Sequence, residues 1–151
     1  MLHQFDFYHI TKGDYINPAI LISEKVLKNS DKLLILAPKD KLAYLSDKLW
    51  GEKKDSFIAH GWSNDALSDV VSIWLSSDAE DNPIEADMLM LTNGQSLDNA
   101  SDFKRVFILF DGSSKKELDL ARSQWHGWSS KAKHVCRYFT QTPSGSWQQR
   151  K

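Results

Sequence analysis

The order of hydrophobic and polar positions in the first half of the chain predicts strand, helix, strand and helix. Residues 4–10 are rich in aromatic side chains, which is typical of a strand. An Asn-Pro pair at 17–18 indicates a cap and a first helical position, and residues 19–29 continue at helical spacing. Residues 33–37 form a short apolar strand, and residues 39–51 form a second helix that ends at a glycine. This alternation predicts parallel strands joined by right-handed crossovers.

The second half has shorter apolar segments between polar loops. Residues 52–69 look irregular, although they include several aromatic side chains. Residues 70–75 predict a third strand, residues 76–86 an acidic surface loop and residues 87–91 a fourth strand. Residues 135–140 predict the last strand. Near the C-terminus, Trp147 either folds back onto the sheet or lines a groove.

The stretch 106–128 is the most informative part of the chain. Residues 106–110 are continuously apolar, as expected for a strand covered on both faces. Asp111-Gly112 predicts a turn. Ser114 and Glu117 form a capping box, in which the hydroxyl accepts from the backbone and the glutamate reaches back to the cap residue.

A helix with an apolar stripe is expected after this cap. The stripe is formed by Leu118, Ala121, Trp125 and Trp128. Lys115, Arg122 and His126 lie along its edge. Cations beside large aromatic rings suit an acidic peptide with an apolar anchor better than they suit catalysis.

Length and composition are ordinary for one globular domain, so we expect residues 1–151 to form a single domain. No apolar run approaches the ~20 residues of a membrane span, and the N-terminus does not resemble a signal peptide. The single cysteine, Cys136, fits a reducing cytoplasm. We therefore expect a cytoplasmic protein without a membrane contact.

Charge is unevenly distributed although the formal net charge is −1, which argues against a general nucleic-acid binder. Residues 55–103 hold ten acidic residues and no lysine or arginine, whereas residues 104–151 hold ten basic and three acidic residues. Either this is a randomly divided solvated surface, or two faces of opposite sign serve two partners.

No arrangement of residues predicts catalysis, a metal site or a cofactor. The turns after residues 37 and 111 lack the glycines that let a backbone approach a pyrophosphate. Asp111 stands where a catalytic acid could stand, but a turn residue that bonds its own backbone is the better interpretation. The five histidines have no metal-binding spacing, and Cys136 is most simply a small buried hydrophobic residue.

Several short motifs resemble a known family. In order, they are Phe7-Tyr8-His9-Ile10, Ala43 to Leu49-Trp50, Ser56-Phe57-Ile58-Ala59-His60, Phe110-Asp111-Gly112 and Ala121-Arg122 to Trp125. Their order and spacing, over essentially the whole chain, resemble the chi subunit of bacterial DNA polymerase III holoenzyme. The resemblance implies an α/β, three-layer Rossmann-like fold with a mostly parallel sheet flanked by helices and without a phosphate-binding loop.

The resemblance also implies a non-catalytic role with two protein partners. Chi subunits pair with the psi subunit, which ties them to the clamp loader. They also bind the acidic, phenylalanine-ended C-terminal tail of single-stranded-DNA-binding protein, so contact with DNA is indirect. By the resemblance, the tail site contains Arg122 and Trp125, and the psi contact lies at Trp50 and Phe57.

The remaining tail-site candidates are Lys115, Lys116, Leu118 and His126. His126 and Ser129 stand where some members have lysine and arginine, so Lys115, Lys116, Lys131 or Lys133 could substitute. Ala59 replaces a proline that is common in the psi motif.

Independent reasoning supports this site, because a guanidinium fork matches a terminal carboxylate and Leu118 with Trp125 could line a slot for a phenyl ring. The helix N-terminus near Ser114 would add partial positive charge.

Four alternatives remain open at this stage. Arg122 could be a surface arginine whose stem packs on Trp125, and Phe57 could be a core residue beneath its loop. The chain could instead be a nucleotide-dependent enzyme on the same fold, which a thermal shift with nucleotides would reveal. Direct binding of single strands by tryptophan and lysine is disfavoured by the missing basic excess.

Overall fold

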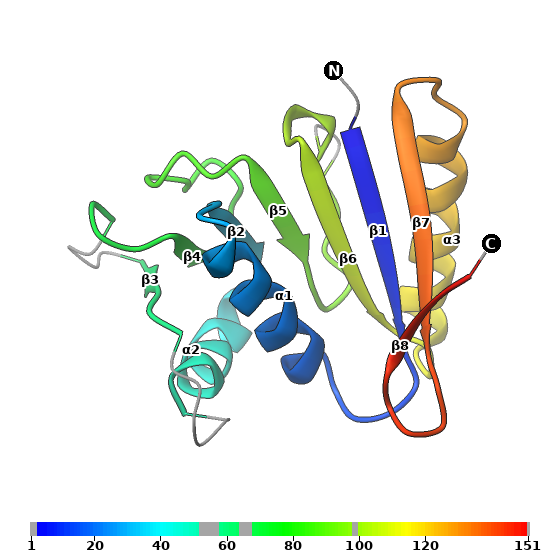
Figure 1. Ribbon diagram of the computed structural model, residues 1–151, viewed down its shortest axis with the longest axis horizontal. Coiled ribbons are helices and arrows are strands. Elements are labelled where there is room, and N and C mark those ends of the chain that lie inside the picture. The colour runs from blue at the N-terminus through cyan, green and yellow to red at the C-terminus, as the bar shows by residue number, and fades with distance from the viewer. Residues whose placement is uncertain (1–2, 52–57, 64–67, 98–99, 151) are drawn as a thin grey trace.

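Eight strands form one sheet at the centre of the protein. The computed structural model describes residues 3–51, 58–63, 68–97 and 100–150, and every structural statement below concerns these ranges. The sheet order is β3-β4-β2-β5-β6-β1-β7-β8 (Figure 1). The strands are β1 (His3–Ile10), β2 (Leu33–Leu36), β3 (Gly61–Trp62), β4 (Ile73–Ser76), β5 (Met88–Leu91), β6 (Arg105–Asp111), β7 (His134–Gln141) and β8 (Trp147–Arg150).

Neighbouring strands are parallel except for the last pair, in which β8 runs antiparallel to β7. The predicted parallel sheet is therefore confirmed. The final strand was not predicted as a strand, but both placements considered for Trp147 are correct, because it folds back onto the sheet and also lines a pocket beside α1. Its ring packs edge-on against Tyr8 with centroids 5.1 Å apart, because the turn after β7 returns the chain to the sheet.

Helices cover both faces of the sheet, so the predicted three-layer architecture is confirmed. Helices α1 (Ile16–Lys28) and α2 (Leu42–Gly51) lie on one face, and α3 (Lys115–Ser129) lies on the other, behind β7 in Figure 1. Side chains alternate along β1 because successive residues of a strand point to opposite faces. Phe5 and Phe7 belong to the core beneath α3, whereas Tyr8 and Ile10 belong to the core beneath α1 and α2.

The helix starts differ from the sequence prediction. Helix α1 begins at Ile16, whose N–H donates to Asp14 Oδ1 at 3.0 Å, so the predicted cap Asn17 lies inside the first turn. The sequence prediction is wrong here because Asp14, two residues before the helix, accepts from a backbone N–H of the first turn in place of Asn17. Helix α2 begins at Leu42, after a single 3₁₀ turn, η1 (Lys39–Lys41), and Gly51 is its last residue.

Two predicted loops contribute to the sheet and its core. The irregular region 52–69 contains the edge strand β3, and the strand predicted from residue 70 begins at Ile73, with Val70 77% exposed. The acidic loop 76–86 buries Ile84 and Ala86. A second 3₁₀ turn, η2 (Ala100–Asp102), precedes β6. Residues outside the helices thus cover part of the α3 side of the sheet.

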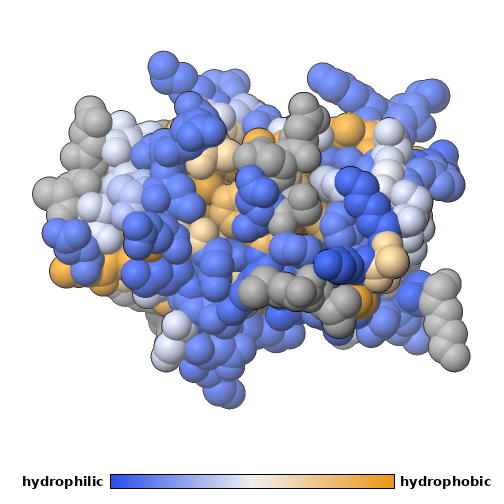
Figure 2. Space-filling model, turned by 90° about the horizontal axis from the view of Figure 1, so that it is seen from above, coloured by the Kyte–Doolittle hydropathy of each residue, from blue (hydrophilic) through white to orange (hydrophobic). Residues whose placement is uncertain are grey.

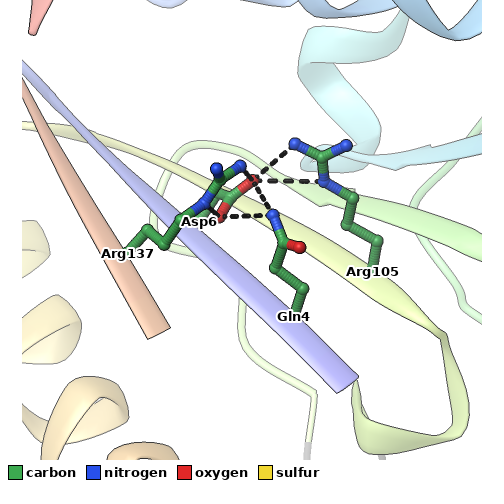
Figure 3. A network of polar contacts seen from close by, with 4 residues as sticks. All are labelled: Gln4, Asp6, Arg105 and Arg137. Atoms are coloured by element: carbon green, nitrogen blue, oxygen red, sulfur yellow. Dashed lines mark hydrogen bonds and ion pairs between the residues drawn. The ribbon is translucent and has the colours of Figure 1, made fainter. Parts of the chain in front are cut away.

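A buried carboxylate joins three strands on the α1 side (Figure 3). The Asp6 side chain is fully buried and accepts hydrogen bonds from Arg105 Nη2 at 2.8 Å and from Arg137 Nε at 2.8 Å. Gln4 donates to the same carboxylate at 3.1 Å. Burial alone raises the pKa of Asp6, but the hydrogen bonds and charges of Arg137 and Arg105 outweigh it and hold this pKa below 3.8.

The end of the sheet at which β1 begins is mostly polar. Figure 2 shows this end, with hydrophilic residues over most of the surface and hydrophobic residues near the centre and at a few places on the rim. Within the described residues, no helix is long and apolar enough to cross a membrane.

Candidate functional site

The candidate site is built on the helix that follows β6. Ser114 caps α3, because its Oγ accepts a hydrogen bond from the Glu117 N–H at 3.2 Å. The other half of the predicted capping box is wrong. The Glu117 carboxylate accepts from the N–H of Asp111 at 3.1 Å, because the preceding turn brings that donor within reach.

Aromatic contacts hold α3 against β1 and β7. Trp128 stacks on Phe5 with ring centroids 4.4 Å apart, and Trp125 meets the edge of Phe7 at 5.2 Å. Trp125 also approaches Tyr138 of β7 at 6.2 Å. Edge-to-face and offset pairs of this kind add about 0.5–1.5 kcal/mol each beyond their buried area. The predicted apolar stripe therefore determines which side of α3 faces the sheet.

A pocket of about 360 Å³ lies between α3 and the sheet. Its helix side consists of Leu118, Ala121, Arg122, Trp125 and His126. Its sheet side consists of Phe7, His9, Phe110 and Tyr138. The pocket thus combines an aromatic floor with cationic or titratable groups at one wall.

Arg122 is the principal charge of this pocket. Its side chain is 68% exposed, and its carboxylate neighbour among the described residues is Asp119, with Nη1 and Oδ1 4.0 Å apart. Such an exposed pair at the limit of contact contributes little to stability. Arg122 can therefore turn toward a ligand without breaking a strong internal interaction.

The floor contains a hydrogen-bonded pair of rings from two strands. His9 Nδ1 and the Tyr138 hydroxyl are hydrogen-bonded, and His9 also packs on Phe110 with centroids 4.9 Å apart. Burial lowers the pKa of His9, and the charge of Arg122 lowers it further. Burial raises the pKa of Tyr138, while Arg122 opposes this shift. Arg122 is therefore close enough to act electrostatically on both rings.

Gly112 makes room for the His9 ring. A side-chain carbon at this position would lie 2.1 Å from His9 Nε2, far inside normal contact distance. The glycine of the predicted turn is thus explained by the close approach of a pocket residue. Its N–H donates to the carbonyl of Ile10 at 2.9 Å, which fixes the turn relative to β1.

Four of the six predicted tail-site residues line the pocket, namely Leu118, Arg122, Trp125 and His126. Lys115 and Lys116 are exposed and do not line it. Lys115 instead pairs with Asp119 at 2.8 Å, one helical turn further on. The pocket begins at Leu118, at the end of the first turn of α3, so the helix dipole acts only weakly there. Lys131 and Lys133 are exposed beyond the helix end and do not line the pocket.

The sequence analysis missed the strand residues of the pocket, which are Phe7, His9, Phe110 and Tyr138. Alternation along β1 places Phe7 and His9 on one face, and this could have been read from the sequence. Their proximity to Tyr138 could not be read from the sequence, because it depends on the pairing of β7 with β1.

Of the two residues predicted to contact the psi subunit, the structure describes Trp50. Trp50 lies near the end of α2, is 38% exposed and packs against the ring of His60 with centroids 4.8 Å apart. His60 is buried and bonded to Ser46 Oγ at 2.7 Å and to the Ile58 carbonyl at 2.8 Å. It is a satisfied core histidine. Phe57 lies outside the described residues.

Asp111 and Cys136, two further candidates from the sequence analysis, can be placed in the structure. Asp111 Oδ1 accepts from the Ser113 N–H at 2.9 Å and its hydroxyl at 2.7 Å, as the turn interpretation predicted. Cys136 is half-buried, and burial raises the pKa of its thiol to about 11. The described ranges contain no group of three or more histidine, cysteine or acidic residues that could hold a metal ion.

Comparison with known proteins agrees with the resemblance noted from the sequence motifs. The family model described as "DNA polymerase III chi subunit, HolC" matches residues 2–135. No significant match is found among curated proteins. Because the family match covers most of the chain, the protein belongs to the DNA polymerase III chi subunit family and is an accessory subunit of that polymerase.

Proposed function

We propose that this chain binds the acidic, phenylalanine-ended C-terminal tail of single-stranded-DNA-binding protein in the pocket beneath α3. Through a second surface at the end of α2 it pairs with the psi subunit. It thereby links the clamp-loader complex to protein-coated single-stranded DNA, without a catalytic step of its own.

The observation that carries the tail proposal is an aromatic slot with an exposed guanidinium beside it. The pocket lining includes the partly exposed rings of Trp125 and Tyr138, which can contact a phenyl group, whereas Phe7 and Phe110 are almost fully buried. Arg122 can donate two parallel hydrogen bonds to a carboxylate. Both features lie within one pocket of about 360 Å³, a size typical of small-ligand sites.

Fluorescence polarisation with a labelled tail peptide tests the proposal. Arg122→Ala should weaken binding roughly tenfold to a hundredfold, because hydrogen bonds to charged groups contribute about 1.5–3 kcal/mol each. Added salt should weaken wild-type binding, since part of the attraction is electrostatic. Circular dichroism verifies that the variant is folded.

Lys28→Ala is the matched control. Lys28 is an exposed cation on α1, on the opposite face of the sheet. Its removal changes the net charge by the same amount and should leave binding nearly unchanged. Equal losses in the two variants would mean that general charge, and not this pocket, attracts the peptide.

The psi proposal rests on the exposed tryptophan at the end of α2. Large aromatic residues are enriched at protein interfaces, and both Trp50 and Tyr44 of α2 are more than one-third exposed. Trp50→Ala should weaken the complex with purified psi subunit in size-exclusion chromatography. Val135→Ala, which alters an exposed apolar residue of β7, is the control. A complex that survives Trp50→Ala unchanged would move the interface elsewhere.

A further inference from the structure

The floor of the α3 pocket contains two polar side chains, His9 and Tyr138, which binding of a phenyl ring does not require. His9 and Tyr138 come from different strands, β1 and β7, and are hydrogen-bonded to each other inside the pocket. Tyr138 lies beyond the residues that the family model matches. Gly112 allows the His9 ring to occupy this position.

Among the described residues, the charged or titratable groups around His9 come from β6, β7 and α3. Tyr138 faces it from β7, Asp111 lies at the end of β6, and Arg122 and His126 line the same pocket from α3. Burial lowers the pKa of His9 first, Arg122 lowers it next, and Asp111 opposes both. These surroundings therefore favour neutral His9.

We propose that His9 and Tyr138 form a second recognition element for the carboxylate of the bound tail, beside Arg122, and that His9 takes up a proton when the tail binds. This inference rests on the proposed tail-binding function. Neutral His9 accepts the Tyr138 O–H at Nδ1. When Nδ1 gains a proton from solvent, it donates to the Tyr138 oxygen, and the Tyr138 hydroxyl proton turns toward the ligand carboxylate.

The direction of the pH effect follows from the change in charge. A carboxylate beside Arg122 offsets the positive charge that disfavours protonated His9, so binding raises the pKa of His9. A group with a higher pKa in the complex than in the free protein makes binding tighter as the pH falls. Each unit of rise corresponds to about a tenfold gain in affinity at low pH.

The direct test is NMR titration of the His9 ring in wild-type protein, alone and saturated with a synthetic acidic peptide that ends in phenylalanine with a free carboxylate. The pKa of His9 should rise with the free-acid peptide and rise less with its C-terminal amide. An unchanged pKa in the complex would overturn the inference. This measurement needs no variant.

Affinity measured between pH 5.5 and 8.5 provides the second test. Wild-type binding should tighten toward pH 5.5. His9→Gln and Tyr138→Phe should each lose most of that gain. His126→Gln is the necessary comparison, because His126 is the other histidine that lines the pocket, and it should retain the gain.

The outcomes separate this inference from the proposed function. Wild-type binding that does not depend on pH, or a dependence that His126→Gln removes and His9→Gln retains, would overturn the role of His9 and leave tail binding intact. Absence of peptide binding at every pH would overturn the tail-binding function itself.

Discussion

Arginine serves two different purposes on the two faces of the sheet. On the α1 face, Arg105 and Arg137 are about one-third exposed and clasp the fully buried Asp6. On the α3 face, Arg122 is 68% exposed. Among the described residues its carboxylate neighbour is Asp119, with Nη1 and Oδ1 4.0 Å apart. Arg105 and Arg137 are thus bound to a buried charge. Burial and an internal partner, rather than residue type, separate a structural arginine from one that can bind a ligand.

The strongest way to test this comparison is to remove the buried carboxylate. Asp6→Ala leaves two partly buried guanidinium groups without their partner and should destabilise the protein by about 3–5 kcal/mol. Asp119→Ala removes an exposed carboxylate and should change stability by about 0.5 kcal/mol or less. Urea unfolding measures both, and similar losses would show that Asp6 is not a structural centre.

Acid pH should weaken the same cluster. The pKa of Asp6 is held below its ordinary value of 3.8 in the folded protein, so the ionised form stabilises folding. This contribution is complete above the unfolded pKa and is lost as the pH falls through the folded pKa. The difference in unfolding free energy between wild type and Asp6→Asn should therefore shrink as the pH falls below about 4. A difference that grows on acidification would contradict the arrangement.

Two glycines sharpen the picture of the α3 face. Gly112→Ala places a carbon against the His9 ring and should cost about 1–3 kcal/mol and weaken peptide binding. Gly127→Ala, on the exposed side of α3 with no atom within 4 Å of the new carbon, should stabilise the protein by about 0.5–1 kcal/mol. Thermal unfolding compares the two. Equal changes in thermal stability would mean that Gly112 is not closely packed against the His9 ring.

The smallest expected effect on stability is that of Arg122. Arg122→Ala should alter the unfolding free energy by about 0.5 kcal/mol or less, because its side chain is exposed and weakly paired. Arg122→Lys should keep stability but recover peptide binding only in part, since lysine lacks the planar fork. A large loss of stability in Arg122→Ala would mean that Arg122 has a structural role like that of Arg105 and Arg137.

Local patterns predicted most elements, and they failed where distant residues intervened. The apolar run of β6 and the stripe of α3 were assigned correctly, because strand and helix periodicities are properties of the local sequence. The cap of α1 and half of the capping box of α3 were wrong. In both cases another donor or acceptor stood closer than the expected one: Asp14 for Ile16 and the Asp111 N–H for Glu117.

Candidate site residues were predicted on one helix and missed on the strands. Helical spacing put Leu118, Arg122 and Trp125 on or beside one stripe, and the family resemblance assigned them to one site. Lys115 has the same spacing but turns to Asp119, a choice between neighbours that periodicity does not resolve. Tyr138 and His9 are far apart in the chain, and only strand pairing joins them.

By itself, the sequence determined the parallel α/β class, the side of α3 that packs on the sheet, and the family resemblance that the family match later confirmed. Hydrophobic periodicity, turn residues and ordered motifs are all readable along one dimension. Tertiary structure alone decided which arginines are bound to Asp6 and which strand residues complete the pocket beside Arg122. The physical reason is that burial and charge pairing depend on the order of strands in the sheet, and that order brings together residues separated by more than a hundred positions.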